Sequence, residues 1–375
     1  MGAIQKLHDL GQSIWYDNIQ RRLLENGELA AMIEQGEIRG VTSNPSIFNK
    51  AIGNSDDYAE EIAVLSAQGL GSEEIYESLA IADIQAATDL FRSLYDESNG
   101  GDGYVSLEVS PYLARDTQAT LAEAKRLWKT IDRPNLMVKI PGTVEGLPAI
   151  TQAIAAGLNV NVTLIFSVTR YEQIMDAYLT GLEQRVEAGL PVDKIASVAS
   201  FFISRIDSTV DKRLQSLAAP GAEALLGQAA VASGKVAYQK YSQVFRDENE
   251  RFAALRAQGA HPQRLLFAST STKNPNYSDI KYVEELIGPG TVNTVPPKTL
   301  DAFRDHGVAQ VTVDTEVEAA YQIFENLAAL SIDINEITQE LEDAGVKSFE
   351  DAFTTLLGSV TRKQGLVTGN RTLSP

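Results

Sequence analysis

Short hydrophobic segments alternate with longer amphipathic ones along most of the chain. The short segments are apolar or alternate apolar with polar residues, a pattern typical of β-strands. Eight of them stand out, at residues 13–17, 39–43, 103–109, 135–140, 158–166, 194–200, 264–270 and 290–295. The first two are brief and are also compatible with a helix or a loop. Amphipathic stretches such as Ser72–Leu94 and Asp116–Lys129 separate the segments. Strands that alternate with helices predict a parallel sheet, and eight such units predict a closed (β/α)8 (TIM) barrel.

Two additions interrupt or follow the alternating pattern. One lies between the sixth and seventh strands, at about 210–262, and is rich in alanine; the other follows the eighth strand, at about 300–375. Both are predicted to be helical. The chain has no short repeat, low-complexity linker or proline-rich hinge that marks a domain boundary. The sequence therefore predicts a single (β/α)8-barrel domain over 1–375, with a helical insertion and a helical C-terminal extension.

Several predicted strands carry polar residues on the face that should point into the barrel. Side chains alternate between the two faces of a strand, so residues of one parity meet the helices and those of the other parity point inward. In the fourth strand, Leu136, Val138 and Ile140 share the outer face, which places Met137 and Lys139 inside. In the fifth strand the predicted outer set is Val160, Val162, Leu164 and Phe166. The polar residues predicted to point inward in the third and fifth strands are Ser106, Glu108, Asn159, Asn161 and Thr163.

A lysine inside a barrel suggests covalent chemistry with a carbonyl group. Burial disfavours the charged form of an amine, and a neutral amine is a good nucleophile that forms imines. Imine chemistry also needs acid/base groups. Glu108 and Thr163 are candidates, as is Asp17, which follows the first strand at the end where barrel enzymes keep their catalytic groups. Taken singly, Lys139 also fits an edge residue whose ammonium reaches water, and Glu108 a structural ion pair. Asn161 and Thr163 together also fit a plain core hydrogen-bond network. Agreement among four strands favours the catalytic interpretation.

Composition and charge narrow the range of partners. The 375 residues are 44% hydrophobic and 22% charged, as in ordinary globular proteins. A formal net charge of −18 disfavours nucleic acids and anionic membrane surfaces as partners. An anionic substrate then needs a local cluster of cations. The chain lacks cysteine, a signal-peptide pattern and a membrane-spanning stretch, which predicts a cytoplasmic protein. The three histidines, His8, His261 and His306, lie far apart in the sequence, so no metal site is expected.

Four motifs, in the segments 40–46, 138–141, 161–167 and 200–205, resemble those of the transaldolases of the pentose phosphate pathway. The segment 40–46 is similar to the family's T(S/T)NPS signature, and the segment 138–141, continued by Thr143 and Gly146, is similar to its KIP(G/A)T Schiff-base strand. Segment 161–167 resembles its N(x)TL(x)FS strand, and segment 200–205 its S(x)F(x)(x)R strand. The four motifs occur in the family's order along nearly the whole barrel. The insertion and the long C-terminal region indicate a longer bacterial subgroup.

The resemblance implies a role for each candidate residue. Lys139 would attack the C2 carbonyl of a ketose, Glu108 and Thr163 would position the water exchanged in imine chemistry, and Asp17 would be the acid/base at the C4 hydroxyl. Asn44 and Asn161 would hold substrate hydroxyls or the dihydroxyacetone unit, and Ser200 would line the same pocket. Arg205 and Lys273 would hold phosphate. The family usually has a second arginine where this chain has Lys273.

Simpler interpretations exist for some of these residues. Arg205 fits a surface ion pair, and Lys273 an exposed loop charge. Asn44 precedes a proline, as in an ordinary turn. Phe202, between Ser200 and Arg205, is expected to be a core residue and is not assigned to the site.

The resemblance implies transfer of a dihydroxyacetone unit from sedoheptulose 7-phosphate to glyceraldehyde 3-phosphate, giving erythrose 4-phosphate and fructose 6-phosphate, without a metal or organic cofactor. One alternative is an aldolase of the fructose 6-phosphate type that releases free dihydroxyacetone. Another is a sugar-phosphate-binding protein without turnover. The sequence leaves a homodimer open as the assembly.

Overall fold

The computed structural model describes residues 2–217, 219–246 and 249–371. Eight strands form one closed barrel in the order β1-β2-β3-β4-β5-β6-β7-β8, and every neighbouring pair is parallel. The strands are β1 (Gln12–Tyr16), β2 (Gly40–Thr42), β3 (Tyr104–Glu108), β4 (Leu136–Pro141), β5 (Val160–Ile165), β6 (Ser197–Phe202), β7 (Arg264–Ala268) and β8 (Thr291–Val295). Each overlaps one of the eight predicted segments, with β1, β4 and β6 extending one or two residues beyond theirs, so the predicted (β/α)8 barrel is confirmed.

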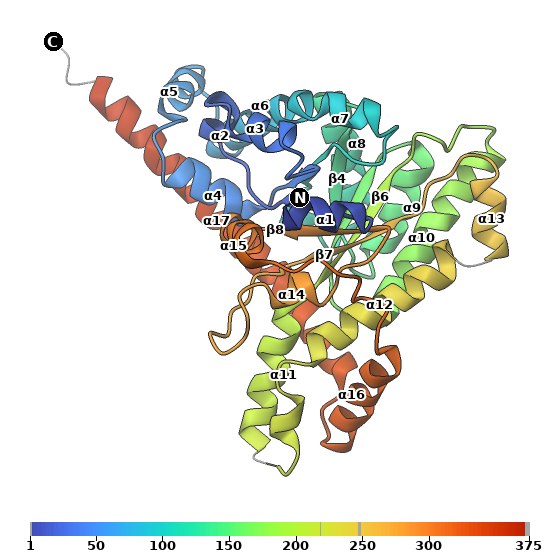
Figure 1. Ribbon diagram of the computed structural model, residues 1–375. Helices are drawn as coiled ribbons and strands as arrows, with labels where there is room; N and C mark the ends of the chain where they lie inside the picture. Colours follow the sequence, from blue (N-terminus) through green and yellow to red (C-terminus); the bar gives the residue numbers. More distant parts are fainter. Residues whose placement is uncertain (1, 218, 247–248, 372–375) are drawn as a thin grey trace.

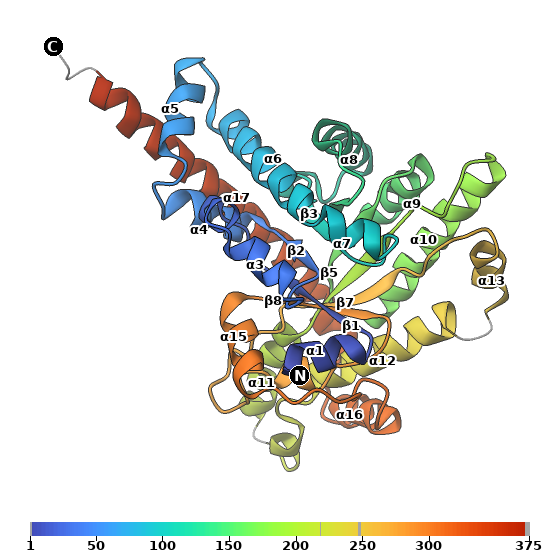
Figure 2. The same ribbon diagram turned by 45° about the horizontal axis from the view of Figure 1, so that its top comes forward.

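Helices surround the barrel on all sides (Figures 1 and 2). Those outside the two predicted additions are α1 (Ala3–Asp9), α2 (Arg21–Glu25), α3 (Glu28–Glu34), α4 (Pro45–Gly53), α5 (Ala59–Ala67), α6 (Ser72–Leu90), α7 (Arg92–Glu97), the 3-10 helix η1 (Pro111–Leu113), α8 (Thr117–Ile131), α9 (Gly146–Ala156), α10 (Val168–Glu187) and α14 (Lys281–Glu284). Local sequence sets several of their starts. The Asp116 side chain accepts a hydrogen bond from the Ala119 amide at the start of α8, and Ser167 does the same for Arg170 in α10.

Both predicted additions are helical. The insertion contains α11 (Ser204–Leu217), η2 (Ala222–Leu225), α12 (Ala229–Phe245) and α13 (Glu250–Arg256), and the extension contains α15 (Pro297–His306), α16 (Val317–Ala329) and α17 (Ile334–Arg371). Residues 218, 247–248 and 372–375 of these two predicted regions lie outside the described residues. The single domain over 1–375 stays a prediction. No helix in the described ranges combines the length and hydrophobicity that crossing a membrane requires.

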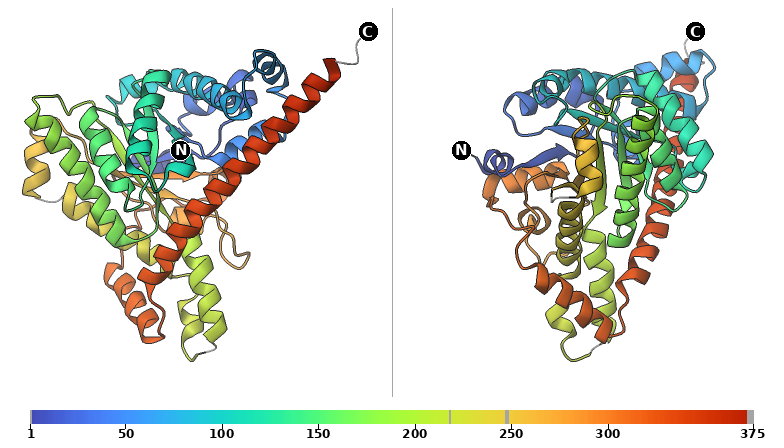
Figure 3. Two further views of the ribbon diagram at one scale, coloured as in Figure 1. Left: turned by 180° about the vertical axis from the view of Figure 1, so that it is seen from behind. Right: turned by 90° about the vertical axis from the view of Figure 1, so that its right-hand side faces the viewer.

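The first and last helices lie at opposite ends of the barrel. The N-terminal helix α1 is on the side that faces the viewer in Figure 1. The long helix α17 crosses the other side, nearest the viewer in the left panel of Figure 3, and packs along α4 and α5. Because α1 leads directly into β1, it marks the N-terminal ends of the strands. The helix α17 therefore covers the end where the strands finish, which is where barrel enzymes carry their active sites.

Hydrogen bonds between side chains of different strands confirm the polar interior. Asn161 in β5 donates from Nδ2 to Ser106 Oγ in β3 (3.1 Å) and accepts from Ser200 Oγ in β6 (2.7 Å). The strand β3 is two strands away from β5, so this contact passes through the inside of the barrel. Asn161 and Ser106 are completely buried, and Lys139 is 5% exposed. The predicted inward positions of these residues are confirmed.

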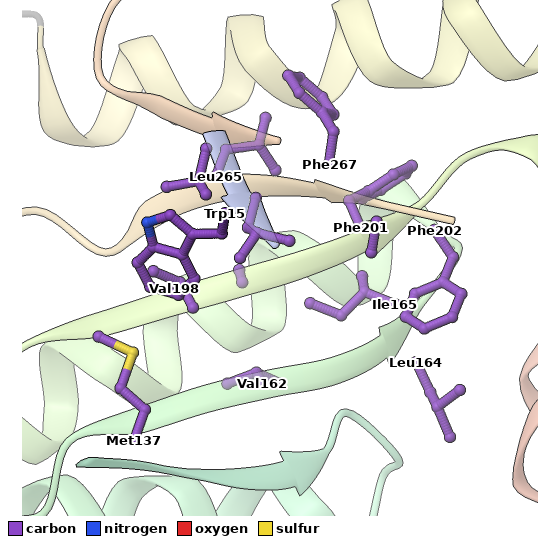
Figure 4. Packing of buried hydrophobic residues seen from close by; sticks show 14 of the residues in the cluster. Trp15, Met137, Val162, Leu164, Ile165, Val198, Phe201, Phe202, Leu265 and Phe267 are labelled. Carbon is purple, nitrogen blue, oxygen red and sulfur yellow. The ribbon is translucent and has the colours of Figure 1, made fainter. Parts of the chain in front are cut away.

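The alternation in β5 breaks after Thr163. The pairs Val162↔Ala199 and Ile165↔Phe201 show that β5 uses one residue more than β6 over this stretch, which is a β-bulge. Leu164 absorbs the extra residue with φ at +60°. The prediction that Leu164 and Phe166 share the outer face with Val162 is therefore wrong. Both side chains lie beside Gly345 of α17 instead, and Figure 4 shows Leu164 and Ile165 on opposite sides of the strand.

Candidate active site

Lys139 lies inside the barrel near the end of β4, surrounded by protein. Its Nζ is 2.6 Å from Glu108 Oε1 in β3 and donates a hydrogen bond to the Ser43 carbonyl oxygen (2.9 Å). Ser43 follows β2, so the strands on one side of Lys139 supply both contacts. These partners fix the position of the amine at the centre of the site. The interpretation of Lys139 as an edge residue that reaches bulk water does not fit, because its side chain is 6% exposed.

The carboxyl group of Glu108 and the hydroxyl group of Thr163 line the same cavity as the amine. Burial raises the pKa of the Glu108 carboxyl, against the opposing effect of the nearby Lys139. Its side chain is 8% exposed, so it can hold a proton close to the amine. Thr163 Oγ1 is shielded from solvent and, within the described residues, has no hydrogen-bond partner. An unpartnered buried hydroxyl is costly, and a substrate or water oxygen beside Lys139 would satisfy it.

Asp17 enters the site from the end of β1. Thr42 Oγ1 in β2 donates to Asp17 Oδ1 over 2.7 Å, and Thr294 Oγ1 in β8 lies 2.6 Å from the same Thr42 oxygen. Since Thr42 gives its proton to Asp17, Thr294 is the donor in the second contact. Burial raises the pKa of Asp17, while the Thr42 hydrogen bond and the cations of Lys139, Lys50 and Lys273 oppose that shift. This carboxyl is held in one orientation and is poised to exchange protons.

The side-chain amides of Asn161 and Asn44 differ in how many of their groups already form hydrogen bonds within the protein. Asn161 accepts from Ser200 and donates to Ser106, so both ends of its amide are held in place. Asn44 caps α4: its Oδ1 accepts from the Ile47 amide (3.0 Å), and Pro45 is the first helical residue. The interpretation of Asn44 as a turn residue before proline is thus accurate for its oxygen. Its amide N–H groups are not used in the cap and can donate to a ligand.

Three cations gather where the strands end. Burial lowers the pKa of Lys273, and the charges of Arg205 and Lys50 lower it further. Burial also lowers the pKa of Arg205, whose guanidinium lies 5.5 Å from the centre of the Phe202 ring. Among the described residues Arg205 makes no ion pair, so the surface ion-pair interpretation does not hold. Although protein around the ammonium lowers its pKa, the Lys273 residue as a whole is exposed, as expected for a loop charge, and it donates to Ser271 Oγ (2.5 Å). This group is the local positive cluster that an anionic substrate of an acidic protein needs.

The long helix α17 closes the site over the barrel. Val346 and Phe349 of α17 line one small cavity together with Lys139, Thr163 and Leu164. Ion pairs hold α17 in place, among them Arg170–Glu342 at 3.3 Å and an Arg115–Asp343 contact. The walls around the amine are therefore largely apolar, which strengthens electrostatic interactions inside the site.

Several residues of the site were not singled out from the sequence. Thr42, the Ser43 carbonyl and Thr294 hold the reactive groups, and Lys50 joins the cations. Thr42 and Ser43 lie within the segment 40–46, next to the Asn-Pro pair that drew attention, so the motif itself was a usable signal. Phe349 carried none, because a helix in a C-terminal extension gives no local indication of where it packs.

The part of the chain that the structure describes contains no set of side chains that could bind a metal ion. No group of three or more His, Asp or Glu side chains there is arranged to hold a metal ion.

Phe202, expected in the core, is 8% exposed and packs against Phe166 with ring centres 5.2 Å apart.

The arrangement of groups suits imine chemistry. A confined primary amine has two carboxyls and one unpartnered hydroxyl around it, and a cationic cluster stands at the mouth of the site. The amine can add to a ketone, the carboxyls can move the protons that dehydration requires, and the resulting iminium can accept the electron pair of a breaking carbon–carbon bond.

Comparison with known proteins agrees with this geometry. The profile of the family described as Transaldolase/Fructose-6-phosphate aldolase matches residues 14–360. A transaldolase of Frankia alni is 47% identical over 363 residues, covering 96% of this chain and 97% of the relative. A transaldolase of Saccharopolyspora erythraea is 49% identical over 358 residues (95% and 96%), and one of Trichodesmium erythraeum is 47% identical over 368 residues (96% of each). The alignments therefore extend over nearly the full length of this chain and of each relative.

Proposed function

Because the chain belongs to the transaldolase/fructose-6-phosphate aldolase family and is a transferase of the transaldolase type, we propose that Lys139 is the amine that carries the transferred group. The observation that carries this proposal is the environment of the Lys139 amine. The side chain is almost completely buried, its nitrogen contacts Glu108, and the unpartnered Thr163 hydroxyl lines the same cavity.

The first half-reaction cleaves a phosphorylated ketose. Lys139 Nζ adds to the C2 carbonyl of sedoheptulose 7-phosphate, and the carbinolamine loses its hydroxyl as water to give an iminium. Glu108 supplies and recovers the proton for this dehydration, and Thr163 holds the departing water. The C3–C4 bond then breaks, with its electron pair moving into the iminium to give an enamine. Asp17 takes the proton of the C4 hydroxyl, and erythrose 4-phosphate leaves.

The second half-reaction reverses the first with a new aldehyde. The enamine carbon attacks the aldehyde carbon of glyceraldehyde 3-phosphate, and Asp17 returns its proton to the new hydroxyl. Water then hydrolyses the iminium and releases fructose 6-phosphate, with Lys139 free again. Since every proton taken in the first half is returned in the second, the side chains end as they began.

Binding of the substrates falls to the amides, one hydroxyl and the cationic cluster. Asn161 and Ser200 form a preset hydrogen-bonded pair, and Asn44 has free N–H donors, so these three hold the hydroxyls of the transferred unit. Arg205 and Lys273 hold the phosphate. Lysine lacks the two-pronged geometry of arginine, so we expect Arg205 to make the larger contribution to phosphate affinity.

The transfer is tested by measuring donor cleavage with and without an acceptor. We expect fructose 6-phosphate to be consumed rapidly when erythrose 4-phosphate is present and only slowly without it. Lys139→Ala should abolish both signals, whereas Lys125→Ala, which removes an exposed lysine from α8, should change neither. Fast release of dihydroxyacetone without an acceptor would instead identify a fructose 6-phosphate aldolase. Binding without turnover would identify a sugar-phosphate-binding protein.

Assembly and location stay predictions. Light-scattering measurement of the mass in solution tests the homodimer, and cell fractionation tests the cytoplasm.

A further inference from the structure

A second cavity opens at the other end of the barrel, where the strands begin. Its volume is about 370 Å³, within the range of small-molecule sites. Seven of the residues that line it are the first or second of their strands, among them Ser13, Tyr104, Ser197 and Arg264. The catalytic residues lie at the opposite ends of the strands. The end of a barrel where the strands begin usually serves stability alone, so a cavity of this size there calls for an explanation.

The floor of the cavity is apolar. Trp15, Met137 and Val198 line it, and Figure 4 shows these three side chains grouped at the end of the strands away from the arrowheads. Trp15 and Tyr104 stand with ring centres 6.2 Å apart. Apolar side chains from β1, β4 and β6 therefore form part of the cavity lining.

The wall carries net positive charge in a strongly acidic protein. Among the described residues that line the cavity are two arginines, Arg39 and Arg264, and one carboxylate, Asp102. The oxygens of Asp102 are fully engaged: they accept from Ser13 Oγ (2.7 Å), Trp15 Nε1 (3.0 Å) and Arg264 Nη1 (3.1 Å). Its charge is thus compensated by partners that it already has.

The two arginines have different roles. Arg264 is structural, since its two Nη groups also donate to the carbonyl oxygens of Gly101 (2.9 Å) and Thr291 (2.7 Å). Arg39 is hardly used: its nearest charged partner is Asp102, 3.6 Å from Nη1, and its Nε is shielded without an acceptor among the described residues. Its side chain is 33% exposed. One guanidinium beside the cavity therefore has donors to offer.

A second unused donor lies in the same wall. The Ile14 amide donates to His8 Nε2 (3.2 Å), which places the proton of the neutral ring on Nδ1, and Nδ1 has no partner in the described chain. Burial lowers the pKa of His8 to about 4, so the ring is neutral at pH 7. Buried donors without acceptors cost free energy that an acceptor ligand would restore. Gln12 also lines the cavity, and its Oε1 is an acceptor without a partner among the described residues, so it can receive a ligand hydroxyl.

We propose that this cavity is a second ligand site that binds a small oxyanion carrying a hydroxyl, such as monohydrogen phosphate or a hydroxy acid, with Arg39 as its principal charged contact. The ligand oxygens accept from Arg39 and His8, and the ligand hydroxyl donates to Gln12. The site is separate from the phosphate-binding cations of the active site, because the two lie at opposite ends of the barrel.

The chain offers a built-in reporter of this site. It contains two tryptophans, Trp15 in the cavity and Trp128 on α8, so Trp128→Phe leaves the emission of Trp15 alone. Inorganic phosphate is titrated into this protein at constant ionic strength, with sodium chloride as the reference, and Tm is followed in parallel. We expect a saturable change in emission and a rise in Tm.

Variants locate the binding. In the Trp128→Phe background we expect Arg39→Gln to weaken the phosphate response at least about tenfold. Arg39→Lys should give an intermediate affinity. Arg92→Gln is the matched control, because it removes an exposed arginine of α7 that pairs only with Asp96 among the described residues. Arg205→Gln removes the arginine of the active site and should leave the emission titration unchanged.

The outcomes separate this site from the proposed catalytic one. Equal titrations of the Arg39→Gln and Arg92→Gln proteins would overturn the proposal. So would loss of the emission response in Arg205→Gln, which would trace that response to the active site. A response reproduced by chloride, or the absence of a saturable change in both emission and Tm, would also overturn it. None of these results bears on Schiff-base formation by Lys139.

Discussion

Removal of the Thr42 hydroxyl should raise the pKa of Asp17, so that less of it is ionised at a given pH, without changing the shape of the site. Valine has nearly the size of threonine, so Thr42→Val deletes the 2.7 Å hydrogen bond to Asp17 Oδ1 and little else. Burial already raises the pKa of Asp17, and this hydrogen bond opposes the shift. Without it the pKa rises further, and the carboxylate that accepts the C4 hydroxyl proton is populated only at higher pH.

The size of the effect follows from the type of hydrogen bond that is lost. A hydrogen bond to a charged group contributes about 1.5–3 kcal/mol. We take the lower end, because Asp17 is partly exposed to solvent. That value corresponds to about a tenfold smaller fraction of carboxylate at pH values below its pKa. The acidic limb of kcat/KM should therefore move to higher pH, with about tenfold lower activity on the limb and a much smaller loss on the plateau.

The assay is the pH profile of donor cleavage in the presence of an acceptor aldehyde. Thr294→Val is the control. Thr294 Oγ1 lies 2.6 Å from the Thr42 oxygen, so this substitution removes a neutral hydrogen bond to Thr42 and leaves the bond from Thr42 to Asp17 in place. Its limb should move less than that of Thr42→Val. An unchanged acidic limb in Thr42→Val, in a protein of normal Tm, would refute the assignment of Asp17 as the base that this hydroxyl tunes.

Three further predictions concern phosphate binding, stability and closure of the site. Arg205→Gln should raise KM for phosphorylated donors at least about tenfold with Tm unchanged, because Arg205 has no carboxylate partner among the described residues; an unchanged KM would contradict its role. Burial raises the pKa of Asp207 to about 6, so its proton is held in the folded state and stability falls as pH rises from about 4 to about 6. Denaturant titrations at several pH values measure the free energy of unfolding, and Asp207→Asn should remove about 3 kcal/mol of its decrease over this pH range. A decrease equal to that of the parent protein would contradict the burial argument. A Cβ at Gly345 would lie 3.1 Å from Leu164 Cδ2, so Gly345→Leu should cost about 1–3 kcal/mol and lower kcat; unchanged Tm and kcat would show that α17 adjusts freely.

In strands without a bulge, the sequence alone predicted which side chains point into the barrel. Met137 and Lys139 were placed inside the barrel by parity alone, because β4 keeps its alternation from end to end and apolar residues occupy its outer face. The partners of Lys139 followed in part. Glu108 was expected from the same parity in β3, whereas the Ser43 carbonyl was not, because a backbone group has no sequence signature.

Alternation along a strand fails to predict side-chain direction in β5, because a bulge interrupts that strand. Leucine is disfavoured at positive φ, so nothing in the local sequence predicts that Leu164 adopts +60°. Its conformation is held by long-range packing against α17, in particular beside Gly345. The extension was correctly predicted to be helical, yet its position over the barrel depends on contacts that span almost 200 residues of sequence. Similarly, His8 and His261 are distant in sequence but line one cavity.

Chemical trapping of the covalent intermediate tests the central claim most directly. The protein is incubated with fructose 6-phosphate, reduced with borohydride, digested and analysed by peptide mass spectrometry. The account predicts a stable three-carbon adduct on the peptide that contains Lys139, absent from Lys139→Ala and retained in Asp17→Asn when dihydroxyacetone replaces fructose 6-phosphate. An adduct on another lysine, or no adduct in a protein that turns over normally, would contradict it.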